Sequence, residues 1–182
     1  STSKTHEFRG SLFARYDQAD SPRTRIAFRE LYYRLSSRHG HSLTLGYNVV
    51  YWGTAESRSL VDIINQTDLV EDAGGDAKLG QPMINLNVIQ DWGEIDLFLL
   101  PGFRKRTFPG ESGRFRFEFP VSSDLAVFEN NESQNNNVDI AVRYSHFLGA
   151  VDFAASGFLG RSREPRFMLE TLTENMLPIY DH

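Results

Sequence analysis

The chain has 182 residues, 40% of them hydrophobic, so one domain with a sizeable core is expected. Its net charge of −5 does not favour nucleic acid as a partner, because domains that bind nucleic acids are usually basic. The lack of cysteine excludes a disulfide framework, a thiol nucleophile and a Cys-ligated zinc site. No window approaches about 18 consecutive apolar residues, so no transmembrane helix is expected, whereas the alternating strands of a membrane barrel remain compatible with the composition.

The first alternating segment covers residues 8–17. Its even positions are mostly apolar, with Phe8 and Tyr16 at the two ends, and its odd positions include Arg9 and Arg15. A period of two predicts a β-strand with one apolar and one polar face.

Residues 25–37 alternate in the same way, but the apolar phase shifts between Phe28 and Leu31. One extra residue in a strand produces such a shift, so we expect a β-bulge near Arg29 and Glu30.

Residues 42–52 form the longest regular alternation and are predicted to be a strand rising from the turn at residues 38–41. One face carries only apolar or aromatic side chains, namely Leu43, Leu45, Tyr47, Val49 and Tyr51. This length suits a strand that crosses a bilayer, whereas a strand in a soluble protein usually has about five or six residues. The apolar face is therefore expected to contact lipid, with Trp52 and Gly53 at the outer rim.

Four further segments repeat the pattern at residues 84–88, 94–99, 138–144 and 151–156, which gives seven spanning strands. Short and long connections alternate along the chain: residues 38–41, 91–94 and 148–150 are tight turns, and residues 54–81, 104–137 and 161 onward are long. This alternation is typical of a transmembrane barrel with short periplasmic turns and long extracellular loops.

Counting residues 114–119 as a spanning strand would break this alternation of short and long connections. They are therefore predicted to form a hairpin arm within an extracellular loop. Residues 57–65 are predicted to form a short helix, and residues 130–137 are polar and of low complexity. The predicted fold class is an all-β, antiparallel transmembrane β-barrel. Seven or eight strands are visible, the eighth near residues 167–172. Because bacterial barrels have even strand numbers, residues 1–182 are expected to be one barrel domain or part of a larger barrel.

Four short motifs extend this prediction: G-Y-N-V-V-Y-W-G at 46–53, I-I-N-Q-T-D at 63–68, Q-P-M-I-N-L at 81–86 and L-L-P-G-F at 99–103. They resemble a group of porin-like proteobacterial outer-membrane barrels of largely unassigned function. The resemblance covers residues 25–108 well and residues 138–166 loosely. It implies a pore or passive uptake route in the bacterial outer membrane, associated in some members with hydrophobic nutrients, and it brings no catalytic residues. Its members are usually longer than this chain.

Polar side chains on the strands are predicted to face the barrel lumen, because charged side chains cannot face lipid cheaply; an arginine at mid-bilayer costs about 2–4 kcal/mol. The predicted lumen-facing residues are Arg9, Arg15, Arg29, Arg34, Asn48, Asn85, Asn87, Asp96, Asp139, Arg143 and Asp152. The arginines could select anionic or carboxylated solutes. Alternatively, they pair with acidic residues across strands and stiffen the wall.

Four aromatic residues, Tyr51, Trp52, Trp92 and Tyr144, are predicted to anchor the barrel at the two membrane interfaces. The alternative is a path of aromatic rings for an apolar ligand.

No motif indicates an enzyme, a cofactor or a metal site. Asp62, Asn65 and Asp68 could bind Ca²⁺, but turn hydrogen bonds by Asn65 and Asp68 are the preferred interpretation. Ser57 or Ser59 near Asp62 would need a placed histidine to act as an esterase site. The histidines show no ligand spacing on one element.

The function predicted from the sequence is a porin-like outer-membrane channel for small solutes, hydrophobic or carboxylated. Its partners would be membrane lipid, lipopolysaccharide and the solute. The alternatives are a soluble β-barrel or sandwich that binds a small ligand and, third, an outer-membrane barrel hydrolase.

Overall fold

The structure is a computed structural model that describes residues 4–52, 63–72, 74–121, 126–128, 138–170 and 175–181. These residues form an all-β fold with one 3-10 turn, η1 (Ser21–Arg23). None of the described residues belongs to a helix long and apolar enough to cross a membrane.

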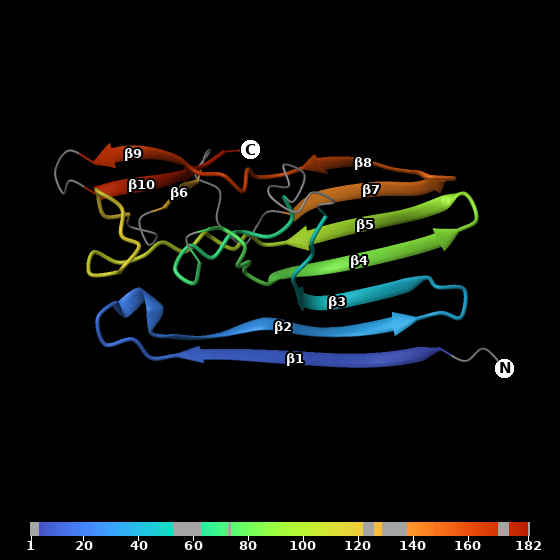
Figure 1. The fold of residues 1–182 in the computed structure, drawn as a ribbon, viewed down its shortest axis with the longest axis horizontal. Helices are drawn as coiled ribbons and strands as arrows, with labels where there is room; N and C mark the ends of the chain where they lie inside the picture. Colours follow the sequence, from blue (N-terminus) through green and yellow to red (C-terminus); the bar gives the residue numbers. More distant parts are fainter. Residues whose placement is uncertain are drawn as a thin grey trace.

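Seven strands lie side by side in one antiparallel sheet (Figure 1). In spatial order they are β1 (Thr5–Arg15), β2 (Arg25–Ser36), β3 (Ser42–Asn48), β4 (Gln81–Gln90), β5 (Gly93–Pro101), β7 (Val138–Leu148) and β8 (Val151–Leu159). Each corresponds to one of the seven predicted strands. Among the described residues, β1 and β8 have one neighbouring strand each, so this sheet is not closed into a barrel.

Short and long connections alternate along the seven strands, as predicted. Tight turns join β2 to β3, β4 to β5 and β7 to β8 at one end of the sheet, and the longer connections lie at the other end (Figure 1). Gly40, Gly93 and Gly149 take positive φ angles of 84°, 135° and 63° in these tight turns. A positive φ is readily adopted by glycine, which explains why each of the three predicted turns contains one.

A three-stranded sheet lies beyond the long-loop end, in the order β6 (Val127–Phe128), β10 (Asn175–Tyr180) and β9 (Arg166–Glu170). The extra strand predicted near residues 167–172 is present as β9, but it pairs with β10, so the prediction that it extends the barrel wall is wrong. Arg161 and Arg163 explain the difference: both are buried where the chain leaves β8, and Arg163 forms an ion pair with Asp139. These contacts hold the chain away from the free edge of β8.

The predicted bulge is confirmed. Ser11 pairs with Glu30 and Leu12 pairs with Phe28, so Arg29 is the extra residue on β2. The bulge restores the alternation, because the apolar positions before and after it lie on the same face.

Two predicted strand assignments are wrong. The strand predicted at residues 42–52 ends at Asn48, because the Val50 amide donates to the Asn65 side chain (2.8 Å) instead of continuing the ladder. Residues 114–119 form turns and bends rather than a hairpin arm. There the Arg116 amide donates to the Gly113 carbonyl at 3.2 Å, which is a turn bond rather than a ladder bond.

The two faces of the seven-stranded sheet differ in composition. We call one transverse line of paired residues the apolar row: Phe8, Tyr33, Leu45, Ile84, Leu99, Ile140 and Leu159, one from each strand. These side chains are 38–74% exposed. On the whole of this face the seven strands carry no Asp, Glu, Lys or Arg.

The opposite face carries a second transverse line of paired residues, displaced from the apolar row by three positions along each strand. We call it the polar row: Thr5, Ser36, Ser42, Asn87, Asp96, Arg143 and Ser156. Towards the long-loop end this face becomes apolar and is covered by the chain, where a buried cluster unites Trp52, Ile64, Met83, Phe98, Leu100 and Ala141. The core of the molecule is therefore at one end of the polar face, between the sheet and the long connections.

Candidate functional site

All eleven residues that the sequence predicts to face a lumen lie on the side of the sheet that carries the polar row. Arg29 reaches this side through the bulge, with its guanidinium carbon 4.4 Å from the centre of the Phe13 ring. Several of them contact polar neighbours across strands. Asn87 donates to both Glu94 (2.6 Å) and Asp96 (2.9 Å), and Arg9 pairs with Glu30 at 2.9 Å. Pairing across strands, the alternative interpretation of the arginines, therefore occurs on this face.

Two of the eleven residues are covered rather than open to solvent. Asp139 is 1% exposed because Arg163 and the chain after β8 pack over it. Asn48 is also buried, and its backbone carbonyl accepts a hydrogen bond from the side-chain Nδ2 of Asn65 at 2.9 Å. The alternation of the sequence predicts which face of the sheet each residue occupies. It does not predict burial, because the segments that cover these two residues are distant in the chain.

The predicted role of Trp52 is wrong. Its side chain is 2% exposed and makes an edge contact with Phe98, with ring centres 5.4 Å apart. An indole buried in the core cannot anchor the protein at a membrane interface. Tyr51 also differs from the prediction: with Val49 it lines a pocket on the polar side, and Lys78 lies over its ring at 4.7 Å.

Trp92 and Tyr144 lie together at the short-turn end of the sheet. Their rings stack with centres 6.2 Å apart, and the Tyr144 hydroxyl donates to the Trp92 carbonyl at 2.6 Å. Phe153 and His146 extend the same aromatic cluster. Trp92 is half exposed, and its interfacial role stays a prediction.

Asn65 organises the connection between β3 and β4. Its carboxamide accepts from the Val50 amide (2.8 Å) and donates to the carbonyls of Asn48 and Leu79, both at 2.9 Å. Asp68 accepts from the Glu71 amide and the Thr107 hydroxyl and pairs with Arg25. Turn hydrogen bonding is therefore confirmed for Asp68, whereas the Asn65 bonds span 14 to 17 residues and join separate segments instead of closing a turn.

Replacing Asn65 with alanine is expected to lower the free energy of unfolding by about 1–3 kcal/mol, because buried backbone groups lose their partners. The measurement is urea unfolding followed by the fluorescence of Trp52 in a Trp92→Phe background, since Trp52 belongs to this connection and is buried against Phe98. Asn85→Ala is the matched control, because the Asn85 carboxamide makes only 3.4 Å contacts. Equal midpoints for the two variants would contradict this role of Asn65.

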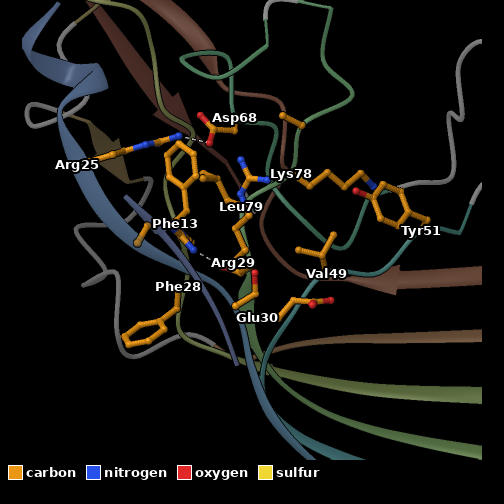
Figure 2. A pocket seen from close by; sticks show the side chains of 15 residues that line it. Phe13, Arg25, Phe28, Arg29, Glu30, Val49, Tyr51, Asp68, Lys78 and Leu79 are labelled. Atoms are coloured by element: carbon orange, nitrogen blue, oxygen red, sulfur yellow. Dashed lines mark hydrogen bonds and ion pairs between the residues drawn. The ribbon is translucent and has the colours of Figure 1, made fainter. Parts of the chain in front are cut away.

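A pocket of about 310 Å³ lies between the polar side of β1 and β2 and the end of the β3–β4 connection (Figure 2). Phe13 and Arg25 come from the two strands, Lys78 and Leu79 from the connection, and Arg104 from the segment after β5. The connection closes onto the sheet at Gly80, where a Cβ atom would clash with the carbonyl oxygen of Arg29. Only glycine allows this approach.

The charges in the pocket are mostly paired. Arg25 pairs with Asp68, and Arg29 lies 3.8 Å from Glu71. Arg104 donates to the Gly80 carbonyl at 2.7 Å, and no carboxylate of the described residues lies within ion-pair distance of it. Burial lowers the pKa of the Arg104 guanidinium, and the nearby Arg25 lowers it further, while Asp68 raises it. The group still carries its charge at neutral pH, because arginine does not lose its proton in proteins.

The sequence did not identify this pocket. Its members alternate correctly on their own strands, but nothing local indicates that Lys78 and Arg104 fold back onto β1 and β2. The nearest signal was the predicted bulge, because it turns Arg29 towards Phe13.

Neither a metal site nor a hydrolytic site gains support from the geometry. Among the described residues no three His, Asp or Glu side chains form a group that could hold a metal ion. Ser57, Ser59 and Asp62 lie outside the described residues, as do most of the predicted helix at residues 57–65 and the whole of residues 130–137.

No protein-family model, curated protein or solved structure matches the chain. The resemblance of the motifs at 46–53, 63–68, 81–86 and 99–103 to porin-like barrels therefore stays a prediction.

Proposed function

We propose that this chain forms part of the wall of an outer-membrane β-barrel that admits small solutes by passive diffusion. The observation that carries the proposal is the pair of opposite rows on the seven-stranded sheet. The apolar row and the rest of its face carry no Asp, Glu, Lys or Arg, while every member of the polar row is polar or charged. A wall between lipid and a water-filled lumen requires this division.

Exposure supports the same proposal. Monomeric proteins in water rarely expose contiguous apolar patches larger than a few hundred Å². Here the apolar row crosses all seven strands, and each of its side chains is 38–74% exposed. A soluble sandwich would cover this face with a second layer, yet the three-stranded sheet lies beyond the strand ends (Figure 1).

The connections suggest how passage is restricted. The β3–β4 connection packs on the polar face, where Ile64 and Trp52 join the buried cluster with Phe98 and Leu100. Solutes would therefore pass an open polar region near the short turns and a narrowed region near the long connections.

Three measurements test the proposal. The purified protein is expected to need detergent, to migrate differently on a denaturing gel before and after boiling, and to give discrete conductance steps in planar lipid bilayers. A protein that stays monomeric in plain buffer and gives no conductance would overturn it.

A further inference from the structure

We propose that the pocket between β1, β2 and residues 77–80 binds a small organic carboxylate that carries an apolar group, with Arg104 as the anchor for its charge. The inference deepens the proposed function, on which it rests, by naming the class of solute that stops at this point. The volume of about 310 Å³ lies at the lower end of the range for ligand pockets and suits one small molecule.

The charged side chains of the pocket favour an anionic ligand. The described lining contains four cationic side chains, Arg25, Arg29, Lys78 and Arg104, and two acidic ones, Glu30 and Asp68. Asp68 is occupied by Arg25, and Glu30 pairs with Arg9, which lies outside the lining. Arg29 lies 3.8 Å from Glu71, outside the lining, so Arg104 is left as a positive charge that an anion would neutralise.

The position of Arg104 makes it the anchor. It is partly buried, one of its terminal nitrogens donates to the Gly80 carbonyl, and no carboxylate of the described residues is within ion-pair distance. A guanidinium presents several N–H groups in a planar fork that matches a carboxylate. A guanidinium that is partly removed from water binds an anion more strongly than one on an open surface.

The remaining wall is apolar, which indicates the rest of the ligand. Val49 and Leu79 contribute aliphatic side chains. Phe13 contributes an aromatic ring, and the guanidinium of Arg29 lies against this ring (Figure 2). Tyr51 is 65% exposed, so this wall leaves a route to solvent. A ring or short alkyl group would bury apolar area here, which an inorganic anion cannot do.

The acidic members limit the ligand charge. Glu30 and Asp68 both line the pocket, so a doubly charged anion such as phosphate would meet repulsion from two carboxylates as well as attraction from the arginines. A single negative charge fits this balance better.

Calorimetric titration of the full, detergent-extracted chain with sodium benzoate tests the inference, with acetate, benzyl alcohol and inorganic phosphate as comparison probes. Benzoate is expected to bind most tightly, because acetate lacks the apolar group and benzyl alcohol lacks the charge. Arg104→Gln should weaken benzoate binding by ~10-fold or more, as expected for loss of a charge-assisted hydrogen bond. Arg116→Gln, at an exposed arginine of the same end, should leave it unchanged.

Arg104→Lys keeps the positive charge but lacks the planar guanidinium, so it should weaken benzoate binding by less than Arg104→Gln does. If the glutamine variant does not fold, the lysine variant tests the inference in its place. Benzoate binding that is unchanged in both Arg104 variants would overturn the inference, as would phosphate binding more tightly than benzoate or acetate binding as tightly. Bilayer conductance is measured on the same samples. Normal conductance with no benzoate binding rejects the pocket alone, whereas lack of conductance rejects the channel itself.

Discussion

Replacing Asp139 with asparagine is expected to lower the free energy of unfolding by about 3–5 kcal/mol. The Asp139 carboxylate is 1% exposed and pairs with Arg163, which is 4% exposed, over an Nη1–Oδ2 distance of 2.6 Å. Burial lowers the pKa of Arg163, and Asp139 opposes this effect. Removing the negative charge leaves a buried guanidinium without compensation.

The ion pair also joins distant segments, which adds to the expected loss. Arg163 donates to the carbonyls of Ile64 (3.1 Å) and Arg161 (3.0 Å), and Asp139 accepts from the Arg161 amide at 3.2 Å. The pair therefore links β7, the β3–β4 connection and the chain after β8. Urea unfolding followed by Trp52 fluorescence measures the loss, because Trp52 belongs to the adjacent buried cluster.

Asp152→Asn is the matched control, since Asp152 lies on the same face of the neighbouring strand and is exposed. It should change the midpoint little, because exposed charges contribute about 0–1 kcal/mol. The double variant Asp139→Leu/Arg163→Met should recover much of the stability, because it removes both buried charges. If Asp139→Asn and Asp152→Asn unfold alike, the ion pair does not hold these segments together.

Replacing Leu86 with arginine is expected to cost about 2–4 kcal/mol in a lipid bilayer if the proposed function is correct. Leu86 lies in the middle of β4 on the apolar face, paired with Leu43 and Leu97. A charged side chain there would meet hydrocarbon. The measurement is the yield of heat-modifiable, folded protein in lipid vesicles as urea is increased.

The adjacent variant Asn87→Arg provides the control, because it places the same charge on the polar face of the same strand. The Asn87 side chain already contacts the carboxylates of Glu94 and Asp96, so an arginine gains attractive partners there. The two variants differ by one position and by the side of the sheet. Equal losses would show that the apolar face does not contact lipid.

The sheet was predictable from the sequence because its rules are local. A period of two assigned all seven strands to their faces, and a one-residue shift at Arg29 identified the bulge. The three glycine-containing turns followed from the need for positive φ. Each signal lies within about a dozen consecutive residues.

The cover of the polar face was not predictable, because it depends on segments far apart in the chain. Trp52 looked like an interfacial residue at a strand end, but its partner Phe98 belongs to β5. The Asp139–Arg163 pair and the approach of Arg104 to Gly80 likewise join residues 24 apart. Alternation shows which face a side chain occupies, but it does not show which loop folds over it.

Within the part of the chain that the structure describes, β1 and β8 are the edge strands of the sheet, and this sets a condition on how such a wall could enter a membrane. Each edge presents a line of backbone N–H and C=O groups, and hydrocarbon offers these groups no hydrogen-bond partner. A seven-stranded wall would therefore have to acquire neighbouring strands as it inserts, so that insertion and ring closure occur as one coupled event. Before that event, the same open edges and apolar face would make the chain depend on a chaperone or another holding partner to avoid self-association.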